Sequence, residues 1–199
     1  MAGGVRLPGG LLLVPVFEEA AHIAISTNVT VLTSPLRADF ITDPVLGLPG
    51  HLGMTLAPGK RNWNSNRDLA ADLVALRGQF HADVLVSLLE DFEYRDLKIL
   101  DLLARARELG IETRSFPFPD GRAPARRDMP RFRELVDGII ASFESGKVVV
   151  IHCRSGLGRT GTVVVCCLVS LGRSPDEAAF GVLFVMREMI RCPLGFPPD

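Results

Sequence analysis

The chain has 199 residues, of which 47% are hydrophobic and 23% charged, and this composition suits one globular domain with a real core. The net charge of -1 argues against general affinity for nucleic acid, which needs a strong basic excess. No apolar run approaches the ~18–20 residues that cross a bilayer, so we expect no stable membrane insertion.

Three regions are predicted along the chain. Residues 1–30 are rich in glycine and apolar residues and form a segment of uncertain structure, although Asn28–Thr33 has the pattern of a strand. Residues 31–190 are expected to form the domain. Residues 191–199 include three prolines, which exclude a helix and predict an irregular tail.

Strand and helix signals alternate within residues 31–190. The predicted strands are Leu52–Ala57, Val84–Leu89, Ile111–Phe116 and the β-branched run Val148–Ile151. The predicted helices are Arg67–Gln79, Asp96–Leu109, one from Asp128 to about Phe143, one from near Arg159 to about Leu171, and one that begins after Ser174-Pro175. This order predicts a single α/β domain with a mostly parallel central sheet and helices on both faces.

A glycine-rich loop follows the strand Val148–Ile151, and ligands of such sheets bind beyond the carboxyl ends of the strands. Gly156 and Gly158 permit the positive φ values of a sharp turn. Consecutive N–H groups in such a turn form an anion nest, and the following helix adds its N-terminal donors. We therefore expect a phosphate to bind to Arg154, Ser155, Gly156, Leu157, Gly158 and Arg159.

Side chains in and beside this loop have predicted chemical roles. Arg159 can donate two hydrogen bonds to phosphate oxygens, a geometry that lysine lacks. The same positive field is expected to stabilise the thiolate of Cys153, which can then attack phosphorus in line. The Thr160 hydroxyl can donate to that thiolate when the intermediate breaks down. His152 is expected either to orient the loop by hydrogen bonds or to pack at the strand end.

The alternative interpretation of Cys153 is a buried structural cysteine before a turn, because free cysteine often packs as a small apolar residue. Against this, the segment has six expected residue types (His, Cys, Gly, Arg, Thr, Gly) at their expected positions. The probability that all six match by chance is about 10⁻⁸ for each starting position in a sequence. The strand–loop–helix context agrees as well, so the sequence favours the catalytic interpretation.

The loop pattern of His-Cys, five residues, Arg and Thr resembles the signature of the protein tyrosine phosphatase superfamily, and it is most similar to the dual-specificity branch. Leu52–Lys60 resembles the entry strand and turn of the kinase-associated phosphatases in that branch. Three further segments resemble that branch in their residue types and in their order along the chain, namely Arg67–Leu76, Val84–Glu90 and Phe116–Pro124. The resemblance implies the cysteine-phosphatase fold and a reaction that proceeds through phosphocysteine without a metal or cofactor.

The resemblance also implies a general acid on a mobile loop some 30 residues before the cysteine. Asp120 precedes Cys153 by 33 positions, and Gly121 allows the loop to bend. Asp120 is therefore predicted to protonate the leaving oxygen and then to activate water. The alternative is that Asp120 only forms part of a Pro-Asp-Gly turn, where aspartate is common. Asp128 is the other candidate for the general acid, but its position suits a helix N-cap better.

Other charged residues are predicted to have no catalytic part. Glu90, Asp91 and Glu93 follow a strand near the expected cleft and are interpreted as solvated loop charges. A basic cluster after Asp120 either flanks an entrance for anionic substrates or lies on a solvated helix face, and we favour the solvated face. The members of this cluster are Arg122, Arg126, Arg127, Arg131 and Arg133.

The sequence therefore predicts a phosphatase that hydrolyses phosphotyrosine and phosphoserine or phosphothreonine in a protein partner, with a protein kinase as one candidate. A lipid or small-molecule phosphatase is the alternative, which Arg154 supports only in part because Leu157 is not basic. A non-catalytic phosphoprotein-binding module is a further alternative, but it would be expected to have lost the nucleophile, the arginine or the acid, and all three are present. Sulfur transfer of the rhodanese type also uses a cysteine loop, but it would not need this arginine and acid. Four cysteines bunched near the C-terminus favour a reduced, cytoplasmic setting.

Overall fold

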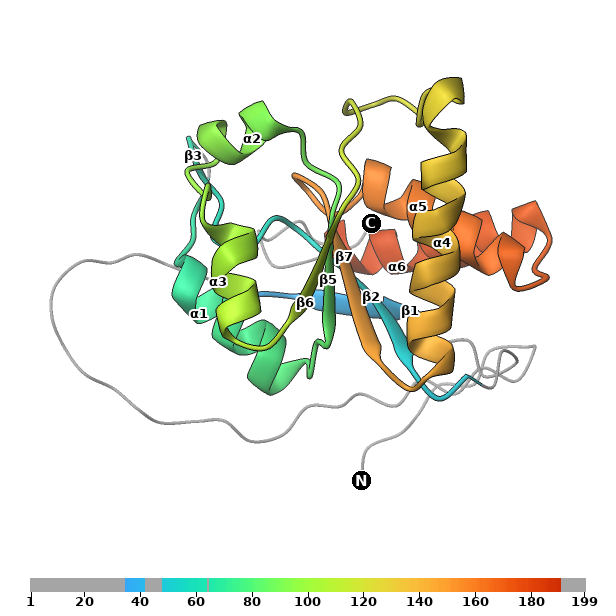
Figure 1. Ribbon diagram of the computed structural model, residues 1–199, viewed down its shortest axis with the longest axis horizontal. Coiled ribbons are helices and arrows are strands. Elements are labelled where there is room, and N and C mark those ends of the chain that lie inside the picture. Colours follow the sequence, from blue (N-terminus) through green and yellow to red (C-terminus); the bar gives the residue numbers. More distant parts are fainter. Residues whose placement is uncertain (1–34, 42–47, 64, 191–199) are drawn as a thin grey trace, which may run out of the picture. The chain divides into compact units, whose positions relative to one another are not determined.

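The computed structural model describes residues 35–41, 48–63 and 65–190, and they are built around a five-stranded sheet (Figure 1). The strand order is β1-β2-β7-β5-β6. The strands are β1 (Ala38–Ile41), β2 (His51–Thr55), β5 (Val84–Ser87), β6 (Glu112–Ser115) and β7 (Val148–His152). The predicted strand Asn28–Thr33 and the predicted tail 191–199 lie outside the described residues.

The sheet is mostly parallel, as predicted. Strand β7 lies in the middle and pairs in parallel with β2 and with β5, which in turn pairs in parallel with β6. A continuous run of valine and isoleucine suits β7 because a central parallel strand is covered on both faces. The antiparallel edge strand β1 was not predicted. Its four residues are all half-buried, so they lack the alternation that marks a strand in sequence.

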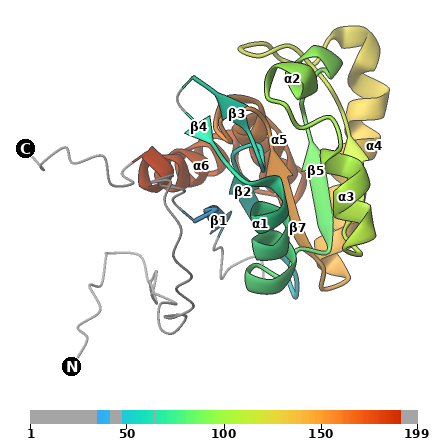
Figure 2. The same ribbon diagram turned by 90° about the vertical axis from the view of Figure 1, so that its left-hand side faces the viewer.

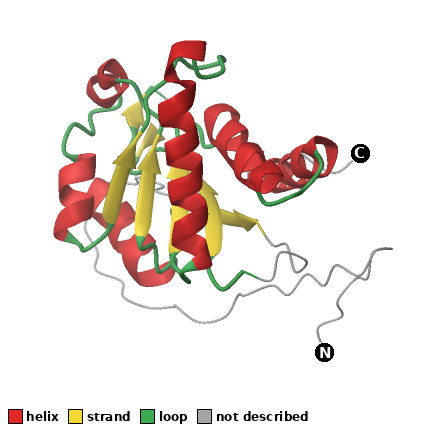
Figure 3. Ribbon diagram, turned by 45° about the vertical axis from the view of Figure 1, so that its right-hand side comes forward, coloured by secondary structure: helices red, strands yellow, loops and turns green. Residues whose placement is uncertain are grey.

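Helices cover both faces of the sheet (Figures 2 and 3), as predicted. In the described residues, no helix is long and apolar enough to cross a membrane. The helical segments are α1 (Leu69–Val74), the π-helix η1 (Ala75–Gln79), α2 (Asp91–Asp96), α3 (Leu102–Glu108), the 3₁₀ turn η2 (Arg126–Asp128), α4 (Met129–Glu144), α5 (Gly158–Ser170) and α6 (Pro175–Ile190).

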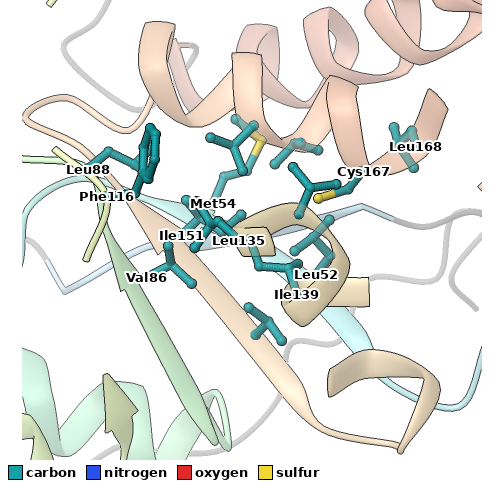
Figure 4. Packing of buried hydrophobic residues seen from close by; sticks show 14 of the residues in the cluster. Leu52, Met54, Val86, Leu88, Phe116, Leu135, Ile139, Ile151, Cys167 and Leu168 are labelled. Atoms are coloured by element: carbon teal, nitrogen blue, oxygen red, sulfur yellow. The ribbon is translucent and has the colours of Figure 1, made fainter. Parts of the chain in front are cut away.

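Alternate side chains of the strands enter two separate cores. Ile151 of β7 packs with residues of α4, α5 and α6, and Figure 4 shows Leu135 and Ile139 of α4 beside it. Val150, the preceding residue, points to the other face and packs with residues of α1, η1 and α3. Both cores therefore hold β7 in place, and with it the loop that follows.

The predicted helix Asp96–Leu109 is wrong in its first half. Helix α2 ends at Asp96, and α3 begins only at Leu102. Between them Lys98 has a φ of 57°, a left-handed conformation that interrupts a right-handed helix. Leu97 and Ile99 are fully buried, so tertiary packing outweighs helix propensity in this segment.

The predicted helix Arg67–Gln79 is only partly confirmed. Regular helix begins at Leu69, because the Asp68 side chain caps it by accepting from the N–H of Ala71 at 2.8 Å. From Ala75 the segment continues as the π-helix η1. The polar loop before it contains a small hairpin that was not predicted, formed by β3 (Arg61–Asn62) and β4 (Ser65–Asn66).

The parallel strands end at one edge of the sheet. The turn Ala57–Lys60 follows β2, the glycine-rich loop follows β7, helix α2 follows β5, and the segment Phe116–Gly121 follows β6. Four segments that are distant in sequence are therefore brought to the same edge, where ligands of such sheets bind.

Candidate active site

The glycine-rich loop joins β7 to α5 at the carboxyl edge of the sheet. Cys153 is the first residue after β7 and is 1% exposed. Gly156 has a φ of 80°, and a Cβ at this position would lie 2.5 Å from the carbonyl carbon and oxygen of Thr55. Both the backbone conformation and the close approach therefore require glycine at position 156.

The backbone of this loop offers hydrogen-bond donors. Within the described part of the chain, the N–H groups of residues 154–157 have no acceptor. Helix α5 begins directly afterwards at Gly158, so the partial positive charge of its N-terminus lies at the same place. Free N–H groups next to a helix N-terminus form a binding site for a phosphate.

Arg159 is held rigidly beneath this loop. Its side chain is fully buried and makes a bidentate ion pair with Glu93 of α2, with Nη1 at 2.5 Å from Oε2 and Nη2 at 2.7 Å from Oε1. Nη1 also donates to the carbonyls of Leu88 at 3.0 Å and Phe118 at 3.2 Å. Its Nε makes no hydrogen bond within the described residues, and its nearest charged neighbour is the carboxylate of Asp120 at 3.2 Å.

The electrostatics of the pair keep both groups charged. Burial by itself would raise the pKa of Glu93, but hydrogen bonds from Arg159 and from the backbone bring that pKa below its ordinary value. Burial likewise opposes the charge of Arg159, and Glu93 more than compensates, so the pKa of Arg159 is raised. The buried guanidinium is therefore a permanent cation with a fixed position.

Glu93 is the residue that sequence reasoning missed, because it was interpreted as a solvated loop charge. It is 2% exposed and lies in the first turn of α2. Its carboxylate also accepts from the N–H of Glu90 at 2.9 Å, which closes a capping box. A glutamate three positions after the N-cap was a sequence signal for this helix start, but its arginine partner is 66 positions away.

Asp120 lies close to Arg159 but remains open to solvent. Its Oδ1 is 3.2 Å from Nε of Arg159, while its side chain is 66% exposed. Phe116 and Phe118, both buried, anchor the start of this loop, and Phe116 packs against Phe132 of α4 at 5.4 Å between ring centroids. The structure thus places the predicted acid beside the loop that was predicted to bind phosphate.

Thr160 and His152 are both fully buried, and His152 directly precedes Cys153. The Thr160 hydroxyl has no hydrogen-bond partner within the described residues. Nδ1 of His152 lies 3.4 Å from the carbonyl oxygen of Cys153. Burial lowers the pKa of His152 to about 4, so its ring is neutral at pH 7 and adds no charge to the site.

The remaining loop residues differ in exposure. Arg154 and Leu157 are half-buried, whereas Ser155 and Gly158 are exposed. All follow Cys153 in the segment that ends at the first residue of α5.

The other described cysteines are not activated. Cys167 is buried and Cys166 is half-buried on α5, and burial raises the pKa of both thiols. Cys192 lies outside the described residues. No cluster of three or more histidine, cysteine, aspartate or glutamate side chains that could hold a metal occurs in residues 35–41, 48–63 and 65–190.

A buried ion pair fixes the turn Ala57–Lys60 beside the loop. Arg67 donates to both carboxylate oxygens of Asp72 at 2.7 Å, and the N–H of Gly59 donates to the same carboxylate at 2.7 Å. The carbonyl of Lys60 accepts from the N–H of Arg67 at 3.1 Å. Helix α1, which carries Asp72, thus determines the conformation of the turn.

Asp72→Asn is expected to lower the free energy of unfolding by about 3 kcal/mol, because it leaves Arg67 buried without its counter-charge. Urea denaturation followed by circular dichroism measures this loss. The control is Asp68→Asn on the same helix, which should change stability by less than about 0.5 kcal/mol because asparagine caps a helix equally well. Equal losses in the two variants would contradict this account.

An open groove of about 720 Å³ lies between the start of α2 and the loop that carries Asp120. Its walls are partly apolar, with Phe92 and Pro117, and they carry charged side chains of both signs, namely Arg95, Arg122, Arg127, Glu90, Asp91 and Asp128. Two arginines of the basic cluster therefore line a groove while they remain exposed to solvent.

Comparisons with known proteins find similarity to phosphatases. A family model described as "Polymorphic toxin system, DSP-PTPase phosphatase" matches residues 60–173. Cyclin-dependent kinase inhibitor 3 of Rattus norvegicus is 30% identical over 149 residues, which cover 73% of this chain and 68% of the relative. Dual specificity protein phosphatase CDC14B of Mus musculus is 31% identical over 83 residues, which cover 42% of this chain and 16% of the relative.

Solved structures show the same fold. A structure of kinase associated phosphatase, with serine in place of its catalytic-site cysteine, has a TM-score of 0.68 at 19% identity and covers 81% of this chain and 99% of that one. The active form of Tk-PTP has a TM-score of 0.53 at 26% identity, with coverage of 78% and 97%.

Proposed function

The chain belongs to the dual-specificity protein tyrosine phosphatase family, and on this premise we propose that it hydrolyses phosphotyrosine and phosphoserine or phosphothreonine through a phosphocysteine intermediate. Members of the family are phosphoric monoester hydrolases. The observation that carries the proposal is the position of Arg159, which is locked by Glu93 directly after a loop with free N–H groups and beside Asp120. A buried arginine that is fixed by a carboxylate can bind an anion in one defined geometry.

In the first step, Sγ of Cys153 attacks phosphorus while the bond from phosphorus to the leaving oxygen breaks. The loop N–H groups and Arg159 stabilise the charge that spreads over the phosphoryl oxygens. Asp120 gives its proton to the leaving oxygen, so that an alcohol or phenol departs. The exposed carboxylate of Asp120, 3.2 Å from Nε of Arg159, supports this role.

In the second step, water attacks the phosphocysteine and Asp120 takes a proton from that water. The bond between phosphorus and sulfur breaks, phosphate leaves, and the thiolate is restored. The Thr160 hydroxyl, which has no other partner within the described residues, donates to the departing sulfur and so favours this cleavage. His152 stays neutral and is fully buried, so its role is to help position the loop.

The proposed substrate is a phosphorylated protein. The groove beside the loop of Asp120 combines apolar side chains with charged side chains of both signs, which suits a polypeptide better than a small polar molecule. The relatives named cyclin-dependent kinase inhibitor 3, of which this chain covers 68%, make a protein kinase the first partner to test.

Asp120→Asn is expected to lower kcat by about 10²–10³-fold on phosphoserine peptides, because their leaving alkoxide needs a proton. The loss on p-nitrophenyl phosphate should be smaller, because nitrophenolate leaves without help. Steady-state kinetics on both substrates measures the difference. Asp137→Asn, which removes an exposed carboxylate from α4, is the matched control and should leave the ratio of the two rates unchanged. An equal loss on both substrates would argue against the acid role of Asp120.

A further inference from the structure

Helix α2 carries Glu93 and has only six residues, so contacts with the rest of the protein must fix its position. Its capping box joins Glu90 to Glu93 at the start of the helix and does not attach α2 to the sheet. Because Glu93 makes a bidentate pair with Arg159, a shift of α2 would also shift the guanidinium. The attachment of α2 to the sheet therefore affects the position of Arg159.

Tyr94, the residue after Glu93, attaches α2 to the end of strand β5. Its side chain is largely buried, and its hydroxyl lies 2.5 Å from Oγ of Ser87, which is fully buried. Burial raises the pKa of Tyr94, so its phenol is protonated at neutral pH and can donate this hydrogen bond. Successive helical residues point in directions about 100° apart, so Glu93 and Tyr94 reach two different elements, α5 and β5.

The strand end that receives Tyr94 also contacts the active site. Ser87 is the last residue of β5, and its carbonyl accepts from the N–H of Phe116, at the start of the acid loop, at 3.0 Å. The carbonyl of the next residue, Leu88, accepts from Nη1 of Arg159 at 3.0 Å. A displaced strand end would therefore disturb both the guanidinium and the acid loop.

These contacts form a closed ring. From Arg159 the ring runs through the ion pair to Glu93 and along the backbone to Tyr94. It continues through the two hydroxyls to Ser87 and along the backbone to Leu88, whose carbonyl returns to Nη1 of Arg159. Buried hydroxyls usually have a partner in any protein, but this one closes a ring that contains the phosphate-binding arginine.

We propose that Tyr94 is a positioning residue: its hydrogen bond to Ser87 holds α2 against β5 and thereby keeps the guanidinium of Arg159 in the geometry that binds phosphate. The inference rests on the proposed function and adds to it a residue that touches neither the substrate nor the reacting atoms. Small displacements matter at such a site, because a misplacement of about 1 Å can lower a rate by about 10²-fold.

Tyr94→Phe tests this role, because it removes the hydroxyl and keeps the packed aromatic ring. The Kd for tungstate, a tetrahedral dianion that resembles phosphate and is not hydrolysed, should rise about tenfold, the scale of one hydrogen bond. kcat/KM on p-nitrophenyl phosphate should fall by a similar factor. Calorimetry and steady-state kinetics measure the two effects, under conditions in which circular dichroism shows the variant to be folded. Ser87→Ala removes the other hydroxyl and should give the same changes.

Ser142→Ala is the matched control for the loss of a buried hydroxyl. Ser142 lies on α4, where its hydroxyl donates to the carbonyl of Gly138 and accepts from Nη2 of Arg114, both at 2.8 Å. This variant should lose stability and yet keep the Kd for tungstate and kcat/KM within about twofold of the wild type. Values for Tyr94→Phe within twofold of the wild type, or equal losses in Ser142→Ala, would overturn the positioning role.

A double-mutant cycle tests the route through Glu93. Because Glu93→Gln already weakens the ring, Tyr94→Phe should lower kcat/KM by less than about twofold in that background. Glu93→Asp, which keeps the charge but shortens the side chain, is the second background if the double variant does not fold. A full tenfold loss in the background used would mean that Tyr94 acts independently of Glu93, and it would overturn the ring.

Failure of the proposed function would give a different result. Binding of tungstate needs no turnover, so a wild-type protein that binds tungstate but hydrolyses no phosphate monoester would reject the proposed function. The Kd of Tyr94→Phe for tungstate would still decide whether Tyr94 positions Arg159.

Discussion

Cys153→Ser should lower kcat on p-nitrophenyl phosphate by at least about 10⁴-fold, the scale on which loss of a catalytic nucleophile acts. A serine hydroxyl in this buried position has no base beside it to remove its proton, since His152 points Nδ1 at a backbone carbonyl. Binding should survive, because the loop N–H groups and Arg159 remain. Calorimetric titration of the variant with a phosphotyrosine peptide measures this retained affinity.

The control for this variant is Cys166→Ser on α5. Cys166 is half-buried, and burial raises the pKa of its thiol, so it has no chemical part in the reaction. Activity of Cys166→Ser within twofold of the wild type is expected. Turnover that persists in Cys153→Ser, with the same KM, would reject Cys153 as the nucleophile.

Glu93→Gln is expected to lower the free energy of unfolding by about 3–5 kcal/mol, because it removes the buried counter-charge of Arg159 and leaves only the exposed carboxylate of Asp120. It should also lower kcat/KM by about 10²-fold, since a displacement of Arg159 by about 1 Å is enough for such a loss. Chemical denaturation and steady-state kinetics measure the two effects.

Glu112→Gln is the matched control, because Glu112 pairs with Arg114 and Lys147 at the opposite end of the sheet with 43% of its side chain exposed. Exposed pairs contribute about 0–1 kcal/mol. A similar cost in the two variants would mean that the buried pair has no special part in stability.

The pH dependence of stability gives a second readout for Glu93. Its folded-state pKa lies below the ordinary 4.5, so the ion pair contributes full stability above pH 4.5 and loses it as the pH falls through the lowered pKa. The stability difference between wild type and Glu93→Gln should therefore be constant near neutral pH and shrink below pH 4.5. A difference that persists undiminished at pH 2 would contradict the charged state of Glu93.

The phosphate-binding loop could be predicted from sequence because its information is local. Strand, cysteine, glycines, arginine and helix all fall within residues 148–161, and each residue type has its own physical reason. The mostly parallel sheet was predictable for a similar reason, since the β-branched run of β7 and the apolar run of β5 each mark a doubly covered strand.

Glu93 and Tyr94 could not be predicted in this way. The importance of Glu93 depends on the ion pair between α2 and α5, which joins it to an arginine 66 positions later. The proposed role of Tyr94 depends on its hydrogen bond to Ser87, a contact between residues on different elements. The break at Lys98 was missed for the same reason, because burial of Leu97 and Ile99 decides it and local propensity does not.

Trapping of the intermediate tests the central proposal most directly. The Asp120→Asn enzyme, mixed with p-nitrophenyl phosphate and quenched in acid within milliseconds, should carry one phosphate on the peptide that contains Cys153, as detected by mass spectrometry, because attack proceeds while hydrolysis lacks its base. Complete turnover of the substrate with no phosphate at Cys153 at any quench time, or with phosphate on another residue, would contradict covalent catalysis by this sulfur.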